Sequence, residues 1–311
     1  MACTNKVLKI IYGDVTLGVY GERFGYIFSY GIGGLESLVV DGREWLYRAP
    51  KPTFWRALTD NDRGNKFHLR SGMWLSADMF VNCVGCNVVV DGKEMGVPAA
   101  PDNNGFTGEE TAEKVVISFT YETITVPSTT VRVSYEINPQ GRIQVDVHYE
   151  GKAELPELPV FGMRFIMPSK AVSYCYEGLS GETYPDRMAG GIPGVYEVEG
   201  LPVTKYLVPQ DCQVHMDTKW LEVNLDTEHS LKFAALDENF AFSCIPYTAE
   251  ELENATHIEE LPPARRTVVS ILGAVRGVGG INSWGADCEE AYHIDATKDI
   301  HYSFVIEMPE E

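Results

Sequence analysis

The sequence predicts an all-β protein, a large antiparallel sandwich with few short helices. Three observations predict it: apolar and polar residues alternate with a period of two in many segments, turn-forming residues separate those segments, and long helical patterns are sparse. Strands joined by turns rather than by helices favour antiparallel layers. Because no linker-like change of composition divides the 311 residues, we expect one domain over 1–311.

The N-terminal part begins with short strands, expected at residues 8–12, 15–20 and 26–30 and separated by glycines. Further on, residues 115–121 are rich in β-branched and aromatic side chains, which favours a strand over a helix.

Residues 131–137 and 143–149 alternate apolar and polar side chains on either side of Asn138-Pro-Gln-Gly141. This pattern predicts a β-hairpin with one buried face.

Strands are also expected near the C-terminus, at residues 267–272 and 300–306. Two helices are expected. One is a short helix within residues 66–79, and the other begins after Thr248, with Glu251 placed to complete a capping box.

The chain is strongly acidic: 25 Lys and Arg against 45 Asp and Glu give a net charge of −20. This charge argues against binding to nucleic acid and against a polybasic membrane patch. The first residues carry no signal-peptide pattern, and the seven cysteines are odd in number and scattered. We therefore expect free thiols in a reducing compartment and a cytoplasmic location.

No metal site is expected in this chain. Cys83 and Cys86 have the spacing of half a zinc knuckle, but a structural zinc site needs four ligands. On a strand, residues three apart point to opposite faces, so both cysteines are interpreted as packing residues. The histidines show no ligand spacing either.

Two segments stand out. In the first, residues 52–65, aromatic anchors precede a tight polar loop with Gly64 as its hinge; generic turn chemistry would explain the polar residues equally well. The acceptors on this loop are Asp60, Asn61 and Asp62. The second segment, 279–286, places Trp284 between small and polar residues. An indole there would be a platform for the C–H face of a sugar, or it would fold back onto the core.

These segments carry a resemblance to the large-type β-galactosidases. Residues 54–64 (FWRALTDNDRG) resemble the family signature FWRAPTDND, and 279–284 (GGINSW) resemble its GGxxSW loop. Residues 178–187 (GLSGETYPDR) and 206–210 (YLVPQ, followed by Lys219-Trp220) resemble two further family segments in the same order. The chain thus resembles the separate small subunit of a two-chain β-galactosidase.

The resemblance implies a galactose mutarotase-like β-supersandwich. It also implies that the catalytic glutamates and the magnesium site belong to a partner large subunit, with which this chain would act on lactose and related β-galactosides. A retaining glycosidase needs two carboxylates about 5–5.5 Å apart. No pair among the 45 acidic residues is defensible as that dyad, so no catalytic residue and no cofactor are expected in this chain.

Site residues are carried over one by one. Trp284 matches a tryptophan that stacks on substrate, and Gly64 matches the start of a mobile active-site loop, with residues 60–62 leading into it. Arg56 matches the same motif, where a structural ion pair is an equally good role. Leu58 replaces the usual proline, and Asp211 stands in a segment that departs from the family pattern. The alternatives are a free carbohydrate-binding module and, with less support, an aldose epimerase.

Overall fold

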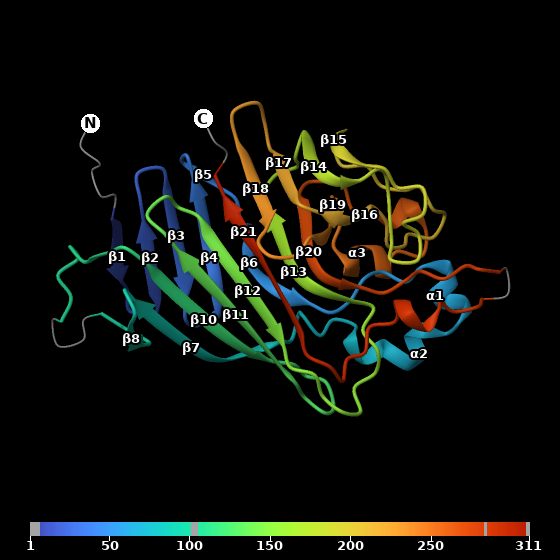
Figure 1. The fold of residues 1–311 in the computed structure, drawn as a ribbon, viewed down its shortest axis with the longest axis horizontal. Coiled ribbons are helices and arrows are strands. Elements are labelled where there is room, and N and C mark those ends of the chain that lie inside the picture. Colours follow the sequence, from blue (N-terminus) through green and yellow to red (C-terminus); the bar gives the residue numbers. More distant parts are fainter. Residues whose placement is uncertain (1–6, 101–104, 283–284, 309–311) are drawn as a thin grey trace.

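The computed structural model describes residues 7–100, 105–282 and 285–308. These residues form three antiparallel sheets of six, ten and five strands, with a few short helices at one end (Figure 1). The predicted all-β antiparallel architecture is confirmed. Among the described residues, no helix has the length and apolar character needed to cross a bilayer.

The six-stranded sheet is built from the N-terminal part of the chain and has the order β5-β4-β3-β2-β1-β9. Its strands are β1 (Leu8–Tyr12), β2 (Thr16–Tyr20), β3 (Phe24–Ser29), β4 (Gly34–Val40), β5 (Arg43–Glu44) and β9 (Thr111–Ala112). In β1 burial alternates strictly, as the period of two predicts.

The ten-stranded sheet spans the molecule in the order β15-β14-β17-β18-β21-β12-β11-β10-β7-β8. Its strands are β7 (Asn82–Val90), β8 (Lys93–Gly96), β10 (Val115–Glu122), β11 (Thr130–Ile137), β12 (Ile143–Tyr149), β14 (Ser173–Leu179), β15 (Pro193–Glu199), β17 (Trp220–Asn224), β18 (Ser230–Ala235) and β21 (Ile300–Glu307). The predicted hairpin is β11–β12, in which Ile137 pairs with Ile143.

The five-stranded sheet has the order β16-β19-β20-β13-β6. Its strands are β6 (Arg48–Thr53), β13 (Val160–Met167), β16 (Val214–Thr218), β19 (Phe240–Ile245) and β20 (Thr267–Val275). Every residue of β13 and β19 is buried. Near-continuous apolar strands of this kind have both faces covered.

The ten-stranded sheet packs against both of the others. Phe28 of the six-stranded sheet lies 5.4 Å from Tyr135, measured between ring centroids. Phe165 of the five-stranded sheet lies 5.2 Å from Phe233 and 6.1 Å from Phe304. One long sheet therefore supplies a face to two adjoining layers of core, which explains how a single chain of this length buries so many aromatic rings.

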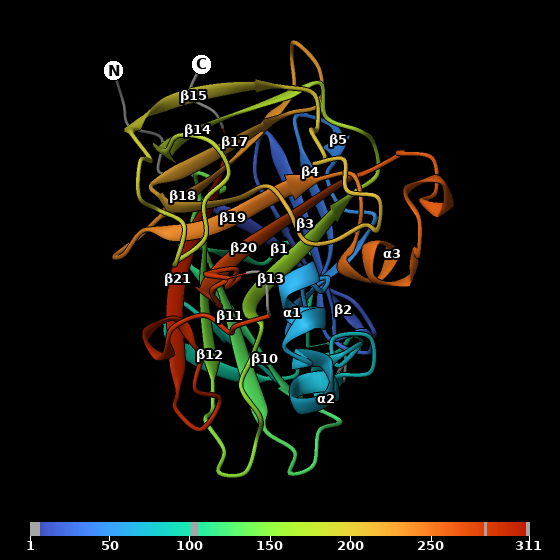
Figure 2. The ribbon, with the colours of Figure 1, turned by 90° about the vertical axis from the view of Figure 1, so that its right-hand side faces the viewer.

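The helices are short: α1 (Asp60–Gly64), α2 (Phe67–Ser71), a 3-10 turn (Gly72–Trp74) and α3 (Ala249–Asn254), with further 3-10 turns at Ile258–Glu260 and Glu290–Tyr292. The capping box predicted for Thr248 and Glu251 is confirmed. The helix expected within 66–79 covers only the first part of that range. Figure 2 shows α1 above α2 and places β15 at the top of the view, above both helices.

The cysteine pair corrects one detail of the prediction. A β-bulge lies between the pairs Gly85–Thr120 and Cys83–Tyr121, so Val84 is left without a partner. The extra residue shifts the side-chain alternation by one position, so Cys83 and Cys86 both pack against the core. The prediction that the two side chains point to opposite faces was wrong, because it assumed an uninterrupted strand. The prediction that both cysteines are packing residues is confirmed.

Candidate functional site

The four segments that carry the family resemblance come together in space. We call this region the motif end and define it by residues 60–65, 186–187, 209–210, 277–282 and 285–287. Hydrogen bonds join each of the first three segments to another part of this set. Since more than 200 residues separate the first segment from the last, tertiary folding alone brings them together.

Residues 60–64 form the short helix α1 rather than the tight loop that the sequence predicted. Thr59 is its N-cap: the Thr59 hydroxyl accepts from the Asp62 amide at 3.2 Å, and the Asp62 carboxylate accepts from the Thr59 amide at 2.9 Å. This capping box buries Asp62 and leaves the side chain of Asp60 72% exposed. Asp60, Asn61 and Asp62 therefore point in different directions and do not form one cluster of acceptors.

Gly64 ends α1 in direct backbone contact with Gly285. A Cβ atom at Gly285 would lie 2.9 Å from the carbonyl carbon of Gly64, and Gly285 has a φ of +76°. Glycine is needed at position 285 for both reasons, the close approach and the left-handed conformation. The predicted hinge residue is thus where the first and the last segment of the motif end touch.

The segment 277–280 is held from two sides. On one side, the Asp186 carboxylate accepts from the amides of Val278 and Gly279, at 3.0 and 2.8 Å. On the other side, the Asn61 side-chain amide donates to the carbonyl of Val278 at 3.0 Å. Arg187 also donates to the carbonyl of Gly279. Segment 178–187 therefore has a structural role here, and Asn61 anchors the loop that leads to Trp284.

The third segment fixes the start of α1. The Asp60 amide donates to the Gln210 side-chain oxygen at 2.8 Å, and Arg63 donates to the carbonyl of Pro209 at 3.2 Å. Gln210 is buried. These contacts satisfy an N-terminal amide that the helix itself leaves without a partner.

Beneath these segments lies a buried ion network. Arg56 Nη1 lies 2.6 Å from Asp62 Oδ2, and both side chains are almost completely buried. Arg276 Nη1 lies 3.5 Å from Asp62 Oδ1. Burial opposes ionisation of Asp62, but Arg56 and the hydrogen bonds from Thr59 outweigh it, so the pKa of Asp62 lies below its ordinary value. The predicted ion-pair role for Arg56 agrees with this geometry.

Arg276 extends the network on its other side. Its Nε lies 3.1 Å from Glu157 Oε2, and Nη2 forms an ion pair with Asp287. The Arg276 guanidinium also lies over the ring of Phe67, 4.4 Å from the centroid, which ties the network to α2. Arg70 of α2 completes it, with Nη2 at 2.6 Å from Asp287 Oδ2.

The charges are balanced within the network, and this limits its chemistry. Burial opposes ionisation of Asp287, but Arg276 outweighs it and the pKa of Asp287 is lowered. On its other side, Glu157 Oε2 lies 2.7 Å from the Nδ1 atom of His293. A carboxylate held charged by arginines is poorly suited to act as a general acid. The network therefore orders the motif end and leaves no obvious proton donor among these carboxylates.

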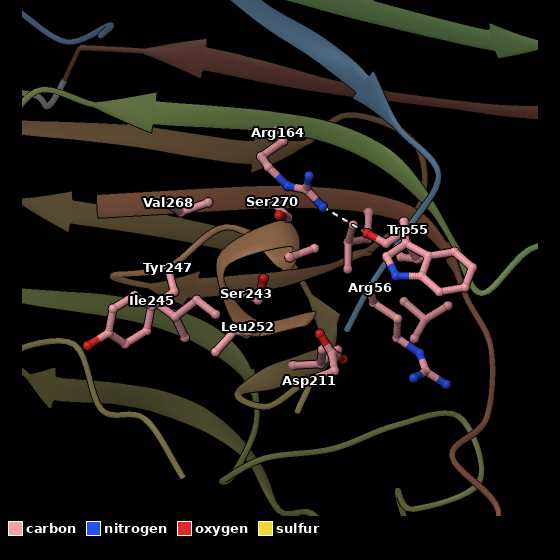
Figure 3. A pocket seen from close by; sticks show the side chains of 15 residues that line it. Trp55, Arg56, Arg164, Asp211, Ser243, Ile245, Tyr247, Leu252, Val268 and Ser270 are labelled. Carbon is pink, nitrogen blue, oxygen red and sulfur yellow. Dashed lines mark hydrogen bonds between the residues drawn. The ribbon is translucent and has the colours of Figure 1, made fainter. Parts of the chain in front are cut away.

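The environment of Asp211 raises its pKa, whereas the environments of Asp62 and Asp287 lower theirs. It lines a cavity of about 30 Å³ beneath α3, together with Trp55, Arg56 and Leu252 (Figure 3). Its carboxylate accepts from the Tyr184 hydroxyl at 2.9 Å. Burial raises the pKa of Asp211 to about 6, and Arg56 opposes that rise only in part. The sequence marked this position merely as a departure from the family pattern.

Within the described part of the chain, one group of residues has metal-ligand chemistry: Asp287, Cys288 and His293 place their ligand atoms within 4.8 Å of one another. Asp287, however, is already paired with Arg276 and Arg70. Two guanidinium groups beside a carboxylate oppose the entry of a cation. The group is better described as part of the ion network.

Trp284, the predicted stacking residue, lies outside the described residues, so its role stays a prediction. Its described neighbour Gly285 belongs to the motif end.

The site residues predicted from the sequence did not include Arg276, Glu157 and Asp287. The available signal was a charged residue inside the apolar, glycine-rich run 273–280, because an arginine there needs buried partners.

The matched family is the β-galactosidase small chain, whose model covers residues 20–306. The chain belongs to this family. It is 61% identical over 316 residues to the β-galactosidase small subunit of Latilactobacillus sakei, covering 98% of this chain and 99% of that one. It is also 32% identical over 305 residues to a β-galactosidase of Halalkalibacterium halodurans, which covers 96% of this chain. The chain spans only 28% of that longer relative.

In architecture the chain is similar to a galactose mutarotase-like protein from Lactobacillus casei ATCC 334. The TM-score is 0.44 at 10% identity, and the alignment covers 94% of this chain and 100% of that one.

Proposed function

We propose that this small subunit acts with a large catalytic subunit to hydrolyse terminal non-reducing β-D-galactose residues, as in lactose, and is inactive or nearly so alone. The observation that carries the proposal is the convergence of four segments at the motif end. Hydrogen bonds link all four: α1 bonds to Gln210 and to Val278, and Gly279 bonds to Asp186. A surface assembled from distant segments, yet rigidly cross-linked, is suited to complete a pocket whose catalytic groups belong to another chain.

The chemistry of the motif end favours a non-catalytic role for this chain. Retaining glycosidases use one carboxylate as nucleophile and another as proton donor. Asp62 and Asp287 are held charged by arginines, and Asp211 contacts Tyr184 and lines a cavity beneath α3. We propose that the dyad and any magnesium ion belong to the large subunit, and that this chain holds no cofactor.

Within the assembly, we propose that Trp284 stacks on the sugar and that the α1 end at Gly64 forms the adjoining loop. The support is positional: Gly285, next to Trp284, contacts Gly64 directly. Asn61 holds the same loop through Val278. Asp60 is the exposed acidic group at this edge, whereas Asp62 and Arg56 are buried beneath it.

The test is an assay of this chain alone, of the large subunit alone and of their mixture with a chromogenic β-galactoside. We expect activity to need the mixture. Full activity of this chain alone would contradict the proposal. A tight monomer that binds galactose and ignores the large subunit would favour a free carbohydrate-binding module instead.

The loop's role is tested by Gly285→Ala, with Gly42→Ala as the matched control. Gly42 has nearly the same φ, +75°, but no atom lies within 4 Å of an added Cβ. Both changes incur the left-handed penalty of about 1–2 kcal/mol, and only Gly285→Ala displaces α1. We expect Gly285→Ala and Trp284→Ala to raise KM in the mixture. Trp284→Phe, which keeps a ring, should retain much of the affinity.

A further inference from the structure

An open cavity of about 380 Å³ lies beside the five-stranded sheet, and none of its lining residues belongs to the motif end. One wall is a cross-strand row in which Ile166 of β13 pairs with Arg48 of β6 and with Val268 of β20. Side chains directly opposite each other on antiparallel strands share a face of the sheet. Phe165 packs on the ten-stranded sheet, so its neighbour Ile166 points to the other, outer face, where the cavity lies.

The other walls come from the start of α3 and from the segment that leads into β20. The first contributes two glutamates, and the second contributes Arg265, Arg266 and the two prolines at 262–263. Together with Arg48, three guanidinium groups therefore line one cavity whose remaining surface is largely apolar. We call it the arginine cavity.

The three arginines of this cavity differ from most arginines of the chain in having no carboxylate partner. Of the thirteen arginines in the sequence, nine form ion pairs. Within the described ranges, no ion pair involves the other four, which are Arg48, Arg132, Arg265 and Arg266. The chain has 45 acidic residues against 25 basic ones, so carboxylates are plentiful. Three of four unpaired arginines in one cavity indicate a site for an anion from outside the chain.

Arg266 is held in place without using its hydrogen-bond donors. Its guanidinium lies over the ring of Tyr47, 3.4 Å from the centroid. Stacking engages the face of the guanidinium, whereas the N–H groups point outward from its edge. No described residue accepts a hydrogen bond from this side chain. Tyr47 therefore orients the group while its donors stay available, which lowers the entropy cost of binding a ligand.

The two glutamates of the cavity have partners elsewhere. Glu250 Oε1 lies 3.4 Å from Arg164 Nη1. The Glu251 carboxylate accepts from the Thr248 amide at 2.8 Å, as part of the capping box of α3. Although both line the same cavity as the three arginines, none of the ion pairs among described residues joins the two groups. The guanidinium groups are thus not neutralised from the opposite wall.

We propose that the arginine cavity binds a small organic anion, with a phosphate or carboxylate group on the arginines and a carbon framework against Ile166 and Val268. A guanidinium matches the oxygens of either anion with two parallel hydrogen bonds. The volume of about 380 Å³ lies in the range of small-molecule sites, which begins near about 300 Å³. The inference goes beyond the proposed function and does not depend on it, because the cavity and the motif end share no residue.

The experiment titrates the full chain by isothermal calorimetry at constant ionic strength with four probes: phenyl phosphate, benzoate, inorganic phosphate and benzylamine. We expect phenyl phosphate or benzoate to bind, and the tighter of the two identifies the anionic group. Inorganic phosphate should bind more weakly, because it has no apolar part to bury. Benzylamine has a similar ring but a positive charge, so it should not bind.

The binding residues are tested with Arg265→Gln and Arg266→Gln. For the tighter aromatic anion, we expect Kd to rise about tenfold in each, as for the loss of one charge-assisted hydrogen-bonding group. Arg265→Lys keeps the charge without the two-pronged geometry and should give a smaller loss. The matched control is Arg132→Gln, which removes the same charge from an exposed position on β11. There Kd should stay within about twofold of wild type, because salt screens distant charges.

Three results would overturn the proposal. One is the absence of binding by both aromatic anions, and another is equally tight binding of benzylamine, which would assign the cavity to cations. The third is an equal loss of affinity in Arg132→Gln and in the two cavity variants, which would mean unspecific attraction to the chain. Thermal unfolding of each variant confirms that the fold is intact, so that a loss of binding reports on the cavity alone.

Discussion

Two regions of the molecule, the core around β10–β12 and the motif end, are stabilised by different interactions. Around β10–β12 the core is made of aromatic and aliphatic side chains on strict alternation, such as Phe119, Tyr135 and Val145. At the motif end, the interior is organised instead by two buried guanidinium groups, Arg56 and Arg276, and their carboxylate partners. The first region is stabilised by burial of apolar surface, and the second by ion pairs between buried side chains.

The difference teaches how each region tolerates change. Apolar contacts are many and individually weak, so a core can repack around a conservative substitution. A buried charge that loses its partner is left uncompensated, which is far more costly than the net value of the pair. We therefore expect the motif end to depend on single residues more than the sheets do.

The largest expected effect is at Arg276. Arg276→Met keeps the side-chain volume beside Phe67 but leaves Glu157 and Asp287 without their buried cation. We expect the free energy of unfolding in urea to fall by about 3–5 kcal/mol. The control is Arg63→Met, whose partner Asp60 is exposed, and there we expect less than about 1 kcal/mol. Equal losses in the two variants would mean that burial of the network contributes nothing.

A smaller, pH-dependent effect is expected at Asp211. Because its pKa is about 6 in the folded chain and near 3.8 unfolded, the folded state binds the extra proton between those values. Stability from this group is therefore lost as the pH rises from about 4 to 6. Asp211→Asn can still accept from Tyr184 and carries no charge. We expect it to be about 1–2 kcal/mol more stable than wild type at pH 7.5, with the gain disappearing near pH 4.

The pH profile is measured by urea unfolding at a series of pH values. Asp14→Asn, at an exposed position, serves as the control and should give a nearly constant difference from wild type. A gain that does not depend on pH would contradict the assignment to Asp211.

The smallest effect is expected in the sheets. The Tyr135 hydroxyl is buried and has no hydrogen-bond partner among the described residues. Tyr135→Phe removes that unsatisfied group, so stability should stay unchanged or rise by up to about 1 kcal/mol. Tyr121 on the neighbouring strand donates to the carbonyl of Gly33 at 2.8 Å, and Tyr121→Phe should lose about 1 kcal/mol. Thermal unfolding of both variants, side by side, checks the difference; a loss at Tyr135 would indicate a partner.

Much of the fold could be predicted from the sequence because strand periodicity is a local property. Residues 131–137 and 143–149 show their buried face directly, and the structure forms β11 and β12 over nearly the same ranges. The capping box at Thr248 and Glu251 was likewise visible in four consecutive residues. The cysteine pair failed because one unpaired residue, Val84, shifts the alternation of β7.

The contacts of the candidate site, in contrast, could not be predicted from local sequence. The resemblance named Arg56, Asp60, Asn61, Asp62 and Gly64, but their neighbours come from residues more than 100 positions away. Capping by Thr59 and pairing with Arg56 are local contacts of the buried Asp62 that the exposed Asp60 lacks. The second arginine, Arg276, comes from 214 positions away and could not be foreseen.

By itself, the sequence determined the strand pattern, the acidic balance of −20 and the family to which the chain belongs. Periodicity and motifs are properties of residues that are close in the sequence, so they can be recognised without any tertiary contact. Only the tertiary structure decided that Gly64 meets Gly285, that Arg276 links three carboxylates and that Val126 lies beside Met73. Each of these depends on the folding of distant segments onto one end of the sheets, where close approach and loss of water give the contacts their energy.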